Sequence, residues 1–390
     1  MAIKFLSKAK TLAKKTVFLR VDFNVPQAKG RIKDDYKIAA GLETIGFLLA
    51  KKCRLVVATH WGEPQGKYQA DLSTKALAAR LAKLSGRNIA FVPAVSGPKV
   101  RAALKKLLPG EILFLENLRF EKGELKNDPK FAKQLTQGID IYVNDAFAVS
   151  HRAQASVGAI KKYLPSYAGF LLEKEVSNLN RILKPIKPLV VVLGGAKIST
   201  KLPLISHLYK KADHILLGGG LANNFFQFQG IQIGRSICEP GIDKEVKKFF
   251  KNGHLNPKII LPVDIVVGLN DKQPRLQAVG NVKAKEAILD IGPDSIALFA
   301  SYIKAAKTIV WNGPMGKFEK DSFKHGTLHL ARAIAAKAKG PAYGLVGGGE
   351  TVEALKLTKM QDYIDWVSTA GGAMLAYLGG DKMPGLEKIV

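Results

Sequence analysis

The chain has 390 residues, 47% of them hydrophobic, and its 60 Lys and Arg residues against 32 Asp and Glu residues give a net charge of +28. This length exceeds what one ordinary core organises, so two domains are expected. No apolar run approaches the roughly 20 residues of a membrane span, and the basic N-terminal stretch lacks the apolar centre of a signal peptide. We therefore expect a cytoplasmic protein that has no membrane partner.

The positive charge indicates attraction to polyanions, which include small phosphates and nucleic acid. The alternative is that the lysines are scattered over a solvated surface. The sequence contains no aromatic-interleaved basic motif and no zinc-finger spacing, so no specific nucleic-acid partner is expected. Cys53 and Cys238 lie too far apart to suggest a metal pair, and both are predicted to be reduced and structural.

Taken in chain order, short β-branched runs alternate with longer helical patterns. The predicted strands are 17–21, 55–59, 112–115, 139–143, 189–193, 214–217, 258–261, 308–311 and 344–346. The clearest helical stretches are 39–51, 73–84 and 323–336. Apolar strands that alternate with helices predict an α/β fold whose parallel sheets are covered on both faces.

The boundary between the two domains is predicted at residues 163–180. Pro165 breaks a helical pattern there, and a new helical pattern starts at 169–175. Residues 1–168 are therefore expected to form one domain and residues 169–374 the other. A helix that joins two α/β halves with no flexible linker is expected to act as a hinge.

Two glycine-rich turns in the second half each follow a short apolar run. The first turn is Gly194-Gly195-Ala196-Lys197, and the second is Gly347-Gly348-Gly349-Glu350-Thr351. Glycine lets the backbone approach an anion, and a following helix start offers free N–H groups and a positive dipole end. The first turn carries a lysine that can meet phosphate charge, and the second carries a carboxylate that can face Mg²⁺. Together the two turns predict a bound nucleotide triphosphate. The alternative for each turn alone is a tight connection without a ligand.

Polar side chains follow the predicted strands of the first half. In open parallel sheets, ligands bind at the carboxyl ends of the strands. The first half would thus present a basic pocket, suited to an anionic acceptor, while the second presents a glycine-lined pocket. The residues concerned in the first half are Asp22, Asn24, His60, Arg119 and Arg152. Structural alternatives remain open, because Asp22 and Asn24 could cap a turn, Arg152 could pair with Asp145, and His60 could be an ordinary loop histidine.

Eight motifs, in a fixed order, make the chain resemble the phosphoglycerate kinase family over essentially its whole length. They are 20–26 (RVDFNVP), 115–120 (LENLRF), 144–147 (NDAF), 151–153 (HRA), 193–197 (LGGAK), 261–264 (LPVD), 311–316 (WNGPMG) and 347–351 (GGGET). The resemblance implies two Rossmann-like domains joined by a hinge helix, with residues 375–390 packing back on the N-terminal domain. It also implies a monomeric glycolytic kinase that transfers a phosphoryl group reversibly between 1,3-bisphosphoglycerate and MgADP, giving 3-phosphoglycerate and MgATP.

The resemblance also implies roles for individual residues. The phosphoglycerate is expected on Asp22, Asn24, Lys37, His60, Glu63, Arg119 and Arg152. The nucleotide is expected on Gly195, Lys197, Lys201, Gly219, Gly220, Asn312, Gly313, Pro314, Lys317, Glu319, Gly348, Gly349, Glu350 and Thr351. The catalytic groups would be Lys197, Lys37, Gly371 and Gly372, and the Mg²⁺ contact would be Glu350. Phosphoryl transfer depends on positioning and on charge neutralisation, which suits this set of lysines, arginines and glycines.

Four positions depart from the family pattern. Glu63 and Lys37 stand where the family has arginines, Ala370 replaces a glycine, and Lys317 replaces an apolar residue. We expect Glu63 to repel the acceptor unless a cation neutralises it, and Lys37 is the predicted partner. The alternative is that Glu63 faces solvent. A second functional hypothesis follows from these departures, namely a nucleotide-binding relative with an altered acceptor or without activity.

Overall fold

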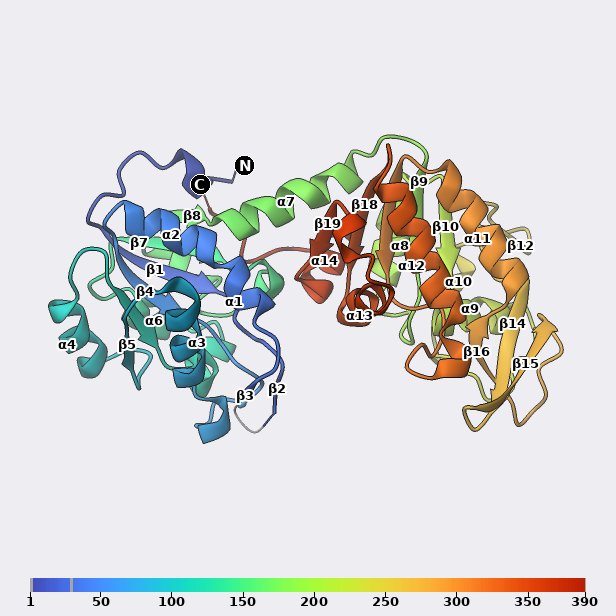
Figure 1. The fold of residues 1–390 in the computed structure, drawn as a ribbon, viewed down its shortest axis with the longest axis horizontal. Helices are drawn as coiled ribbons and strands as arrows, with labels where there is room; N and C mark the ends of the chain where they lie inside the picture. Colours follow the sequence, from blue (N-terminus) through green and yellow to red (C-terminus); the bar gives the residue numbers. More distant parts are fainter. Residues whose placement is uncertain (1–2, 29–30, 390) are drawn as a thin grey trace. The chain divides into compact units, whose positions relative to one another are not determined.

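The computed structural model describes residues 3–28 and 31–389. The chain forms two compact units, one of Met1–Ser177 with Lys382–Val390 and the other of Asn178–Asp381. Figure 1 shows α7 (Phe170–Leu183), the helix in which the first division falls. The predicted domain boundaries lie at 168/169 and 374/375, and they stay a prediction. Residues 1, 2, 29, 30 and 390 of the predicted N-terminal domain lie outside the described residues.

The first unit is built on a six-stranded parallel sheet of order β5-β6-β4-β1-β7-β8. Its strands are β1 (Thr16–Val21), β4 (Arg54–Ala58), β5 (Ile89–Val92), β6 (Ile112–Leu115), β7 (Ile141–Asp145) and β8 (Ser166–Ala168). The helices are α1 (Tyr36–Ala40), α2 (Leu42–Ala50), α3 (Lys75–Ser85), α4 (Pro98–Lys106), α5 (Lys122–Leu125) and α6 (Pro129–Leu135). The short strands β2 (Gln27–Ala28) and β3 (Arg31–Ile32) form a separate antiparallel pair.

Helices cover both faces of this sheet. Successive residues of a strand point to opposite faces, and both sets of side chains are buried in β1. Val17 and Leu19 of β1 pack in one core with Leu48 of α2 and Leu81 of α3, while Phe18 packs in another core. That second core includes residues of α4 and α6. A strand that is buried on both faces reads as a continuous apolar run, which is why β1, β4 and β6 were predictable from the sequence.

The second unit has a six-stranded parallel sheet of order β13-β10-β9-β17-β18-β19. Its strands are β9 (Leu189–Leu193), β10 (His214–Leu217), β13 (Ile259–Ile260), β17 (Thr308–Asn312), β18 (Tyr343–Gly347) and β19 (Trp366–Ser368). The helices are α8 (Leu202–Tyr209), α9 (Gly219–Phe228), α10 (Asp243–Lys247), α11 (Pro293–Ala305), α12 (His325–Ala338), α13 (Gly349–Thr358) and α14 (Gly371–Leu378).

An antiparallel sheet that the sequence did not predict belongs to the second unit. It has the order β15-β14-β16, with β14 (Asp264–Leu269), β15 (Lys272–Ala278) and β16 (Ala287–Ile291). A small hairpin joins β11 (Phe250–Lys251) to β12 (His254–Leu255). The predicted α/β class with two parallel sheets is confirmed. None of the described helices is long and apolar enough to cross a bilayer.

Candidate active site

The polar residues predicted in the first half gather at the carboxyl edge of the first sheet. Asp22 follows β1, His60 follows β4, Arg119 follows β6, and Arg152 follows β7. The strands β6, β4, β1 and β7 are successive neighbours in the sheet, so the loops that follow them meet at one edge. Asp22, His60 and Arg119 are buried, and Arg152 is partly exposed.

Asp22 is held in its charged form by Lys37. Lys37 Nζ donates to Asp22 Oδ2 at 2.7 Å. Burial by itself raises the pKa of Asp22, but the charge and hydrogen bond of Lys37, with His60 and Arg20, outweigh it and leave this pKa at about 2. Lys37 is therefore paired with a carboxylate of the same chain.

His60 lies between Asp22 and Arg20. Burial holds the pKa of His60 well below its usual value, so the ring is neutral at pH 7. Arg20 Nη2 is 3.3 Å from His60 Nδ1. Because a guanidinium N–H can only donate, Nδ1 is the acceptor and the ring proton is on Nε2. His60 can thus offer an N–H to an anion.

Asn24 shapes the turn after β4 by accepting a hydrogen bond on Oδ1 from the Gly62 amide at 2.9 Å. Gly62 adopts φ +65°, and an added Cβ would lie 2.7 Å from Leu72 Cδ2. The Gly62 carbonyl in turn accepts from Arg119 Nη1 at 2.9 Å. The amide of Asn24 also bonds to Asp22 Oδ1 at 3.3 Å, so the structural role considered for these two residues coexists with their place at the site.

The predicted pairing of Lys37 with Glu63 is wrong. Glu63 Oε1 lies 2.6 Å from Arg119 Nη1 and 3.4 Å from Arg152 Nη1, while Lys37 pairs with Asp22. The reason is proximity, because the turn that Gly62 makes places Glu63 beside Arg119. The alternative pairing of Arg152 with Asp145 is not found either, since Asp145 Oδ1 accepts from the Leu172 amide at 3.1 Å.

A buried acid behind this cluster was missed by the sequence analysis. Glu124 is fully buried, with Ser156 donating to it from Oγ at 2.6 Å and from its amide at 2.8 Å. Arg20 Nε donates to Ser156 Oγ at 2.9 Å, which links Glu124 to the guanidinium that faces His60. Glu124 stands in a strongly polar stretch, EKGELKND, that reads as solvated loop, so no sequence signal marked it.

In the second unit, three glycine-rich helix starts follow strands of the parallel sheet. Helix α9 begins after Gly218, α13 after Gly348 and α14 after Ala370. Their first amides have no partner within the helix and carry the positive end of the helix dipole. Gly371 and Gly372 are the first residues of α14, so their amides belong to such a start.

The glycine turns pack backbone against backbone, which explains why glycine is needed. An added Cβ at Gly194 would lie 1.9 Å from the Pro314 carbonyl oxygen, and one at Gly313 would lie 2.4 Å from the Gly194 carbonyl oxygen. Gly195, Gly313 and Gly348 also adopt positive φ, at +90°, +94° and +99°. A β-carbon at Gly194 or Gly313 would therefore require movement of the main chain.

Buried polar side chains hold these turns together. Asn312 Nδ2 donates to the Gly347 carbonyl at 2.7 Å, and the Gly313 amide donates to Thr351 Oγ1 at 2.7 Å. Lys201 Nζ donates to the carbonyls of Gly194 and Asn312. Burial lowers the pKa of Lys201 to about 8, although the charge of Glu350 opposes this shift. Lys201 is thus a cation held directly beneath the turns.

A pocket of about 560 Å³ lies above the glycine turns in this unit. Seven residues predicted for the nucleotide line it, namely Gly195, Gly219, Gly220, Pro314, Lys317, Glu319 and Glu350. The other predicted residues, Lys197, Lys201, Asn312, Gly313, Gly348, Gly349 and Thr351, are not among its lining residues. Lys197 is exposed in the turn after β9.

The antiparallel sheet supplies one wall of this pocket. Asp271, Ile288, Leu289 and Asp290 line it, and Lys317 forms an ion pair with Asp271. Asn223 also lines the pocket, and its Oδ1 is buried without a hydrogen-bond partner among the described residues. The sequence missed this wall because it missed the sheet.

Ala370 causes no strain at the start of α14. Its φ is −129°, a value that any L-residue adopts, and its side chain is buried. An added Cβ at neighbouring Gly371 would lie 3.2 Å from Gly348 Cα, so α13 and α14 begin close together. The methyl group at 370 is thus accommodated.

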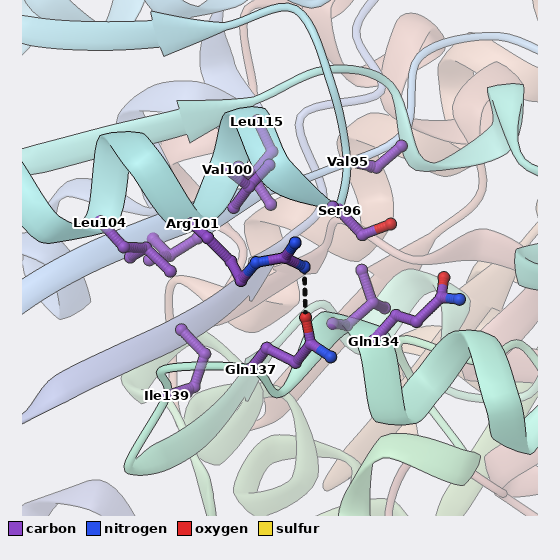
Figure 2. Close-up of a pocket in the computed structure, with 12 residues that line it drawn as sticks. Val95, Ser96, Val100, Arg101, Leu104, Leu115, Gln134, Gln137 and Ile139 are labelled. Carbon is purple, nitrogen blue, oxygen red and sulfur yellow. Dashed lines mark hydrogen bonds between the residues drawn. The ribbon is translucent and has the colours of Figure 1, made fainter.

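Figure 2 shows a smaller hollow in the first unit, between α4 and the segment from α6 to Ile139. Its volume is about 10 Å³, and Arg101 Nη1 donates to Gln137 Oε1 across it at 2.9 Å. That space holds about one water molecule, and none of the predicted site residues lines it. It is too small to hold a substrate or a nucleotide.

The chain is similar to known proteins over nearly its whole length. The family profile of phosphoglycerate kinase matches residues 7–381. The chain belongs to the phosphoglycerate kinase family. It is 42% identical over 380 residues to phosphoglycerate kinase of Desulforudis audaxviator, with 96% of each chain covered. It is 43% identical over 378 residues to that of Bartonella bacilliformis, with 95% of this chain and 94% of the relative covered.

Solved structures of phosphoglycerate kinases share the fold. The structure from Coxiella burnetii has a TM-score of 0.87 at 37% identity and covers 100% of this chain and 99% of its own. The structure from Pyrococcus horikoshii has a TM-score of 0.84 at 32% identity, with 99% and 98% covered. The family resemblance and the fold class predicted from the motifs are therefore confirmed.

Proposed function

We propose that this phosphoglycerate kinase family member transfers a phosphoryl group reversibly between 1,3-bisphosphoglycerate and MgADP, giving 3-phosphoglycerate and MgATP. The observation that carries the proposal is the pocket above the glycine turns, because glycine turns, helix N-termini and a buried lysine suit a bound polyphosphate. The cationic edge of the first sheet supports it as the site of an anionic acceptor.

In the direction of ATP consumption, a carboxylate oxygen of 3-phosphoglycerate attacks the γ-phosphorus. The bond between this phosphorus and the bridging oxygen of ADP breaks as the new bond forms. We assign Lys197 and the amides of Gly371 and Gly372 to the charge on the transferring oxygens. Lys201, which already lies beneath the turns, would neutralise nucleotide phosphate charge.

Glu350 is the residue proposed to meet Mg²⁺. It lies in the first turn of α13 and lines the pocket. No group of three or more His, Cys, Asp or Glu that could hold a metal occurs among the described residues. This fits a magnesium that arrives with the nucleotide, since such sites use one or two carboxylates plus substrate phosphates. The bound ion would supply neutralisation of phosphate charge.

We propose that Asp22, Asn24, Lys37, His60, Arg119 and Arg152 bind the phosphoglycerate. Arg119 and Arg152 offer planar forks that suit phosphate or carboxylate. The neutral His60 can donate from Nε2, and Asn24 fixes the loop that carries Glu63. Asp22 would act through Lys37, whose ammonium it holds at 2.7 Å.

A coupled assay of purified protein with 3-phosphoglycerate and MgATP tests the proposal. We expect ADP to be released only when both substrates are present. Binding of MgATP without turnover of 3-phosphoglycerate would point to the alternative of a relative with a different acceptor or without activity. That outcome would leave the nucleotide site intact and exclude the proposed acceptor.

Closure of two domains, 1–168 with 375–390 and 169–374, is part of the proposal because the proposed acceptor and nucleotide residues belong to different compact units. Closure would also exclude water from a readily hydrolysed acyl phosphate. Small-angle scattering should show compaction with both ligands and none with either alone. A ternary mixture as extended as the free protein would exclude closure.

A cytoplasmic location and a monomeric state are also proposed, in line with the family resemblance. Cell fractionation and size-exclusion chromatography with light scattering would test them.

No specific nucleic-acid partner is expected for this basic chain. Retention of the protein on polynucleotide that persists as the salt concentration rises would contradict this expectation.

A further inference from the structure

Glu63 occupies the position that an anionic ligand of the two arginines would take. Its Oε1 lies 2.6 Å from Arg119 Nη1 and 3.4 Å from Arg152 Nη1, so both guanidinium groups approach the same carboxylate oxygen. Arginine guanidinium groups also bind phosphate and carboxylate groups of ligands through charge-assisted hydrogen bonds. The contact thus resembles a ligand contact made within the chain.

The backbone that carries Glu63 is fixed. The Gly62 amide donates to Asn24 Oδ1 at 2.9 Å, and the Gly62 carbonyl accepts from Arg119 Nη1 at 2.9 Å. Trp61 is buried, with its indole Nε1 donating to the Val25 carbonyl at 2.9 Å. These bonds hold the main chain of the turn so that residue 63 lies beside Arg119.

The side chain of Glu63 can nevertheless leave. It is 54% exposed, whereas that of Arg119 is 1% exposed and that of Arg152 is 47% exposed. Only the carboxylate tip is held, and rotation about the side-chain torsions would move it to solvent. A ligand anion could then take its place on the arginines.

Arg119 retains unused capacity for a ligand. Its Nε is buried and has no hydrogen-bond partner among the described residues. Burial lowers the pKa of Arg119 from its usual value, while the charge of Glu63 raises it. A buried guanidinium with one carboxylate contact and a free N–H is only partly satisfied.

We propose that Glu63 is an internal anion that competes with the acceptor for Arg119 and Arg152, and so sets the acceptor affinity of this chain. The proposal rests on the proposed function for the identity of the acceptor. The anionic group that displaces Glu63 is either the phosphate or the carboxylate of that acceptor. A ligand can bind these arginines only after their ion pairs with Glu63 are broken. The free energy needed to break them weakens the binding of any such ligand.

The test is calorimetric titration of 3-phosphoglycerate, inorganic phosphate, glycerate and MgATP into wild type, Glu63→Gln and Glu63→Ala. The matched control is Glu121→Gln, which removes the same charge from an exposed residue two positions after Arg119. We expect both Glu63 variants to bind 3-phosphoglycerate about tenfold more tightly. The control should change by less than about twofold, because exposed charges are screened.

In turnover, we expect the Glu63 variants to lower the KM for 3-phosphoglycerate while their KM for MgATP stays unchanged. A tighter complex with inorganic phosphate alone would identify phosphate as the displacing group, and one with glycerate alone would identify the carboxylate. We expect the melting temperatures of the two Glu63 variants to fall below that of wild type, because Arg119 is 1% exposed and would lose its carboxylate partner. The titrations are therefore made well below these melting temperatures.

Equal affinities in Glu63→Gln and Glu121→Gln would overturn the proposal. Weaker anion binding in both Glu63 variants would also overturn it, because Glu63 would then position the arginines instead of competing for them. If inorganic phosphate shows the effect while no protein, wild type included, binds 3-phosphoglycerate, the proposed function fails and the inference about Glu63 stands.

Discussion

The two candidate ligand sites of this chain are built by different means. In the first unit the site consists of side chains that already pair with one another, as Lys37 does with Asp22 and Arg119 with Glu63. In the second unit it consists of glycine backbone, helix starts and a lysine held by carbonyls. A side-chain site can be retuned by one substitution, whereas the backbone site cannot accept a side chain at turn positions such as Gly194 and Gly313, where main-chain atoms are in contact.

The largest effect is expected for Lys197→Ala, because Lys197 is an exposed cation beside the glycine turns, whereas Lys201 is held by main-chain carbonyls. We expect turnover to fall by about two to four orders of magnitude, which is the range for removal of one positioned electrostatic group. The melting temperature should stay within error, since Lys197 is exposed. Steady-state kinetics with Lys210→Ala, another exposed lysine of this unit, provide the control. Near-normal turnover would remove Lys197 from the mechanism.

Gly194→Ala should break the backbone site. The new Cβ would lie 1.9 Å from the Pro314 carbonyl oxygen, so the main chain must move. We expect a loss of about 1–3 kcal/mol in unfolding free energy and at least about tenfold weaker MgATP binding. Gly349→Ala is the matched control for stability, because its Cβ would meet no atom within 4 Å. Equal denaturation midpoints for the two variants would contradict the account of the turns.

Asp290→Asn tests a buried acid at the wall of the nucleotide pocket. Burial raises the pKa of Asp290 from 3.8 to about 7, although hydrogen bonds from the amides of Gly326 and Ile291 act to lower it. A carboxyl group whose pKa is higher in the folded than in the unfolded protein stabilises the fold while it is protonated. This contribution to the free energy of unfolding is complete at pH values below the unfolded-state pKa and is lost as the pH rises through the folded-state pKa. Wild type should thus lose stability relative to the variant between about pH 4 and 7. Denaturant titrations at several pH values measure this, and parallel pH profiles would refute it.

The smallest effect is expected for Lys317→Ala. Its ion pair with Asp271 is exposed, with side chains 43% and 34% accessible, so the pair contributes at most about 1 kcal/mol. MgATP affinity should change by less than about fivefold, because the charge of Lys317 is already paired with Asp271. Calorimetry with Asp271→Asn separates loss of the pair from loss of the stem. A much larger drop would place the Lys317 charge on the nucleotide.

Parallel strands buried on both faces were the most predictable elements. The bounds predicted for β6, β9 and β10 agree with the structure because each is an apolar run ended by polar or glycine residues. The strand β15 was missed because its residues, KQPRLQA, are largely exposed and include a proline. The single helix predicted over 39–51 is two helices, α1 and α2, which meet at Gly41.

At the sites, residue order along the chain predicted which side chains share an edge but not which charges pair. Lys37 and Glu63 were expected to neutralise each other, yet Lys37 reaches Asp22, and Gly62 turns Glu63 toward Arg119. Such choices depend on distances of a few ångströms, which sequence spacing does not contain. Glu124 was missed for a similar reason, because the residues beside it in the sequence are polar and do not indicate that it is buried.

Residues 384–389 complete the first unit, and their position in the sequence affects the order in which the two units can fold during synthesis. Lys161 Nζ donates to the carbonyls of Pro384 and Glu387, Asn144 Nδ2 donates to that of Gly385 at 3.0 Å, and the Lys4 amide donates to that of Ile389 at 2.9 Å. The second unit is thus an insertion within the first. During synthesis, the first unit cannot complete these bonds until residues 384–389 have been made, which follows synthesis of the whole second unit.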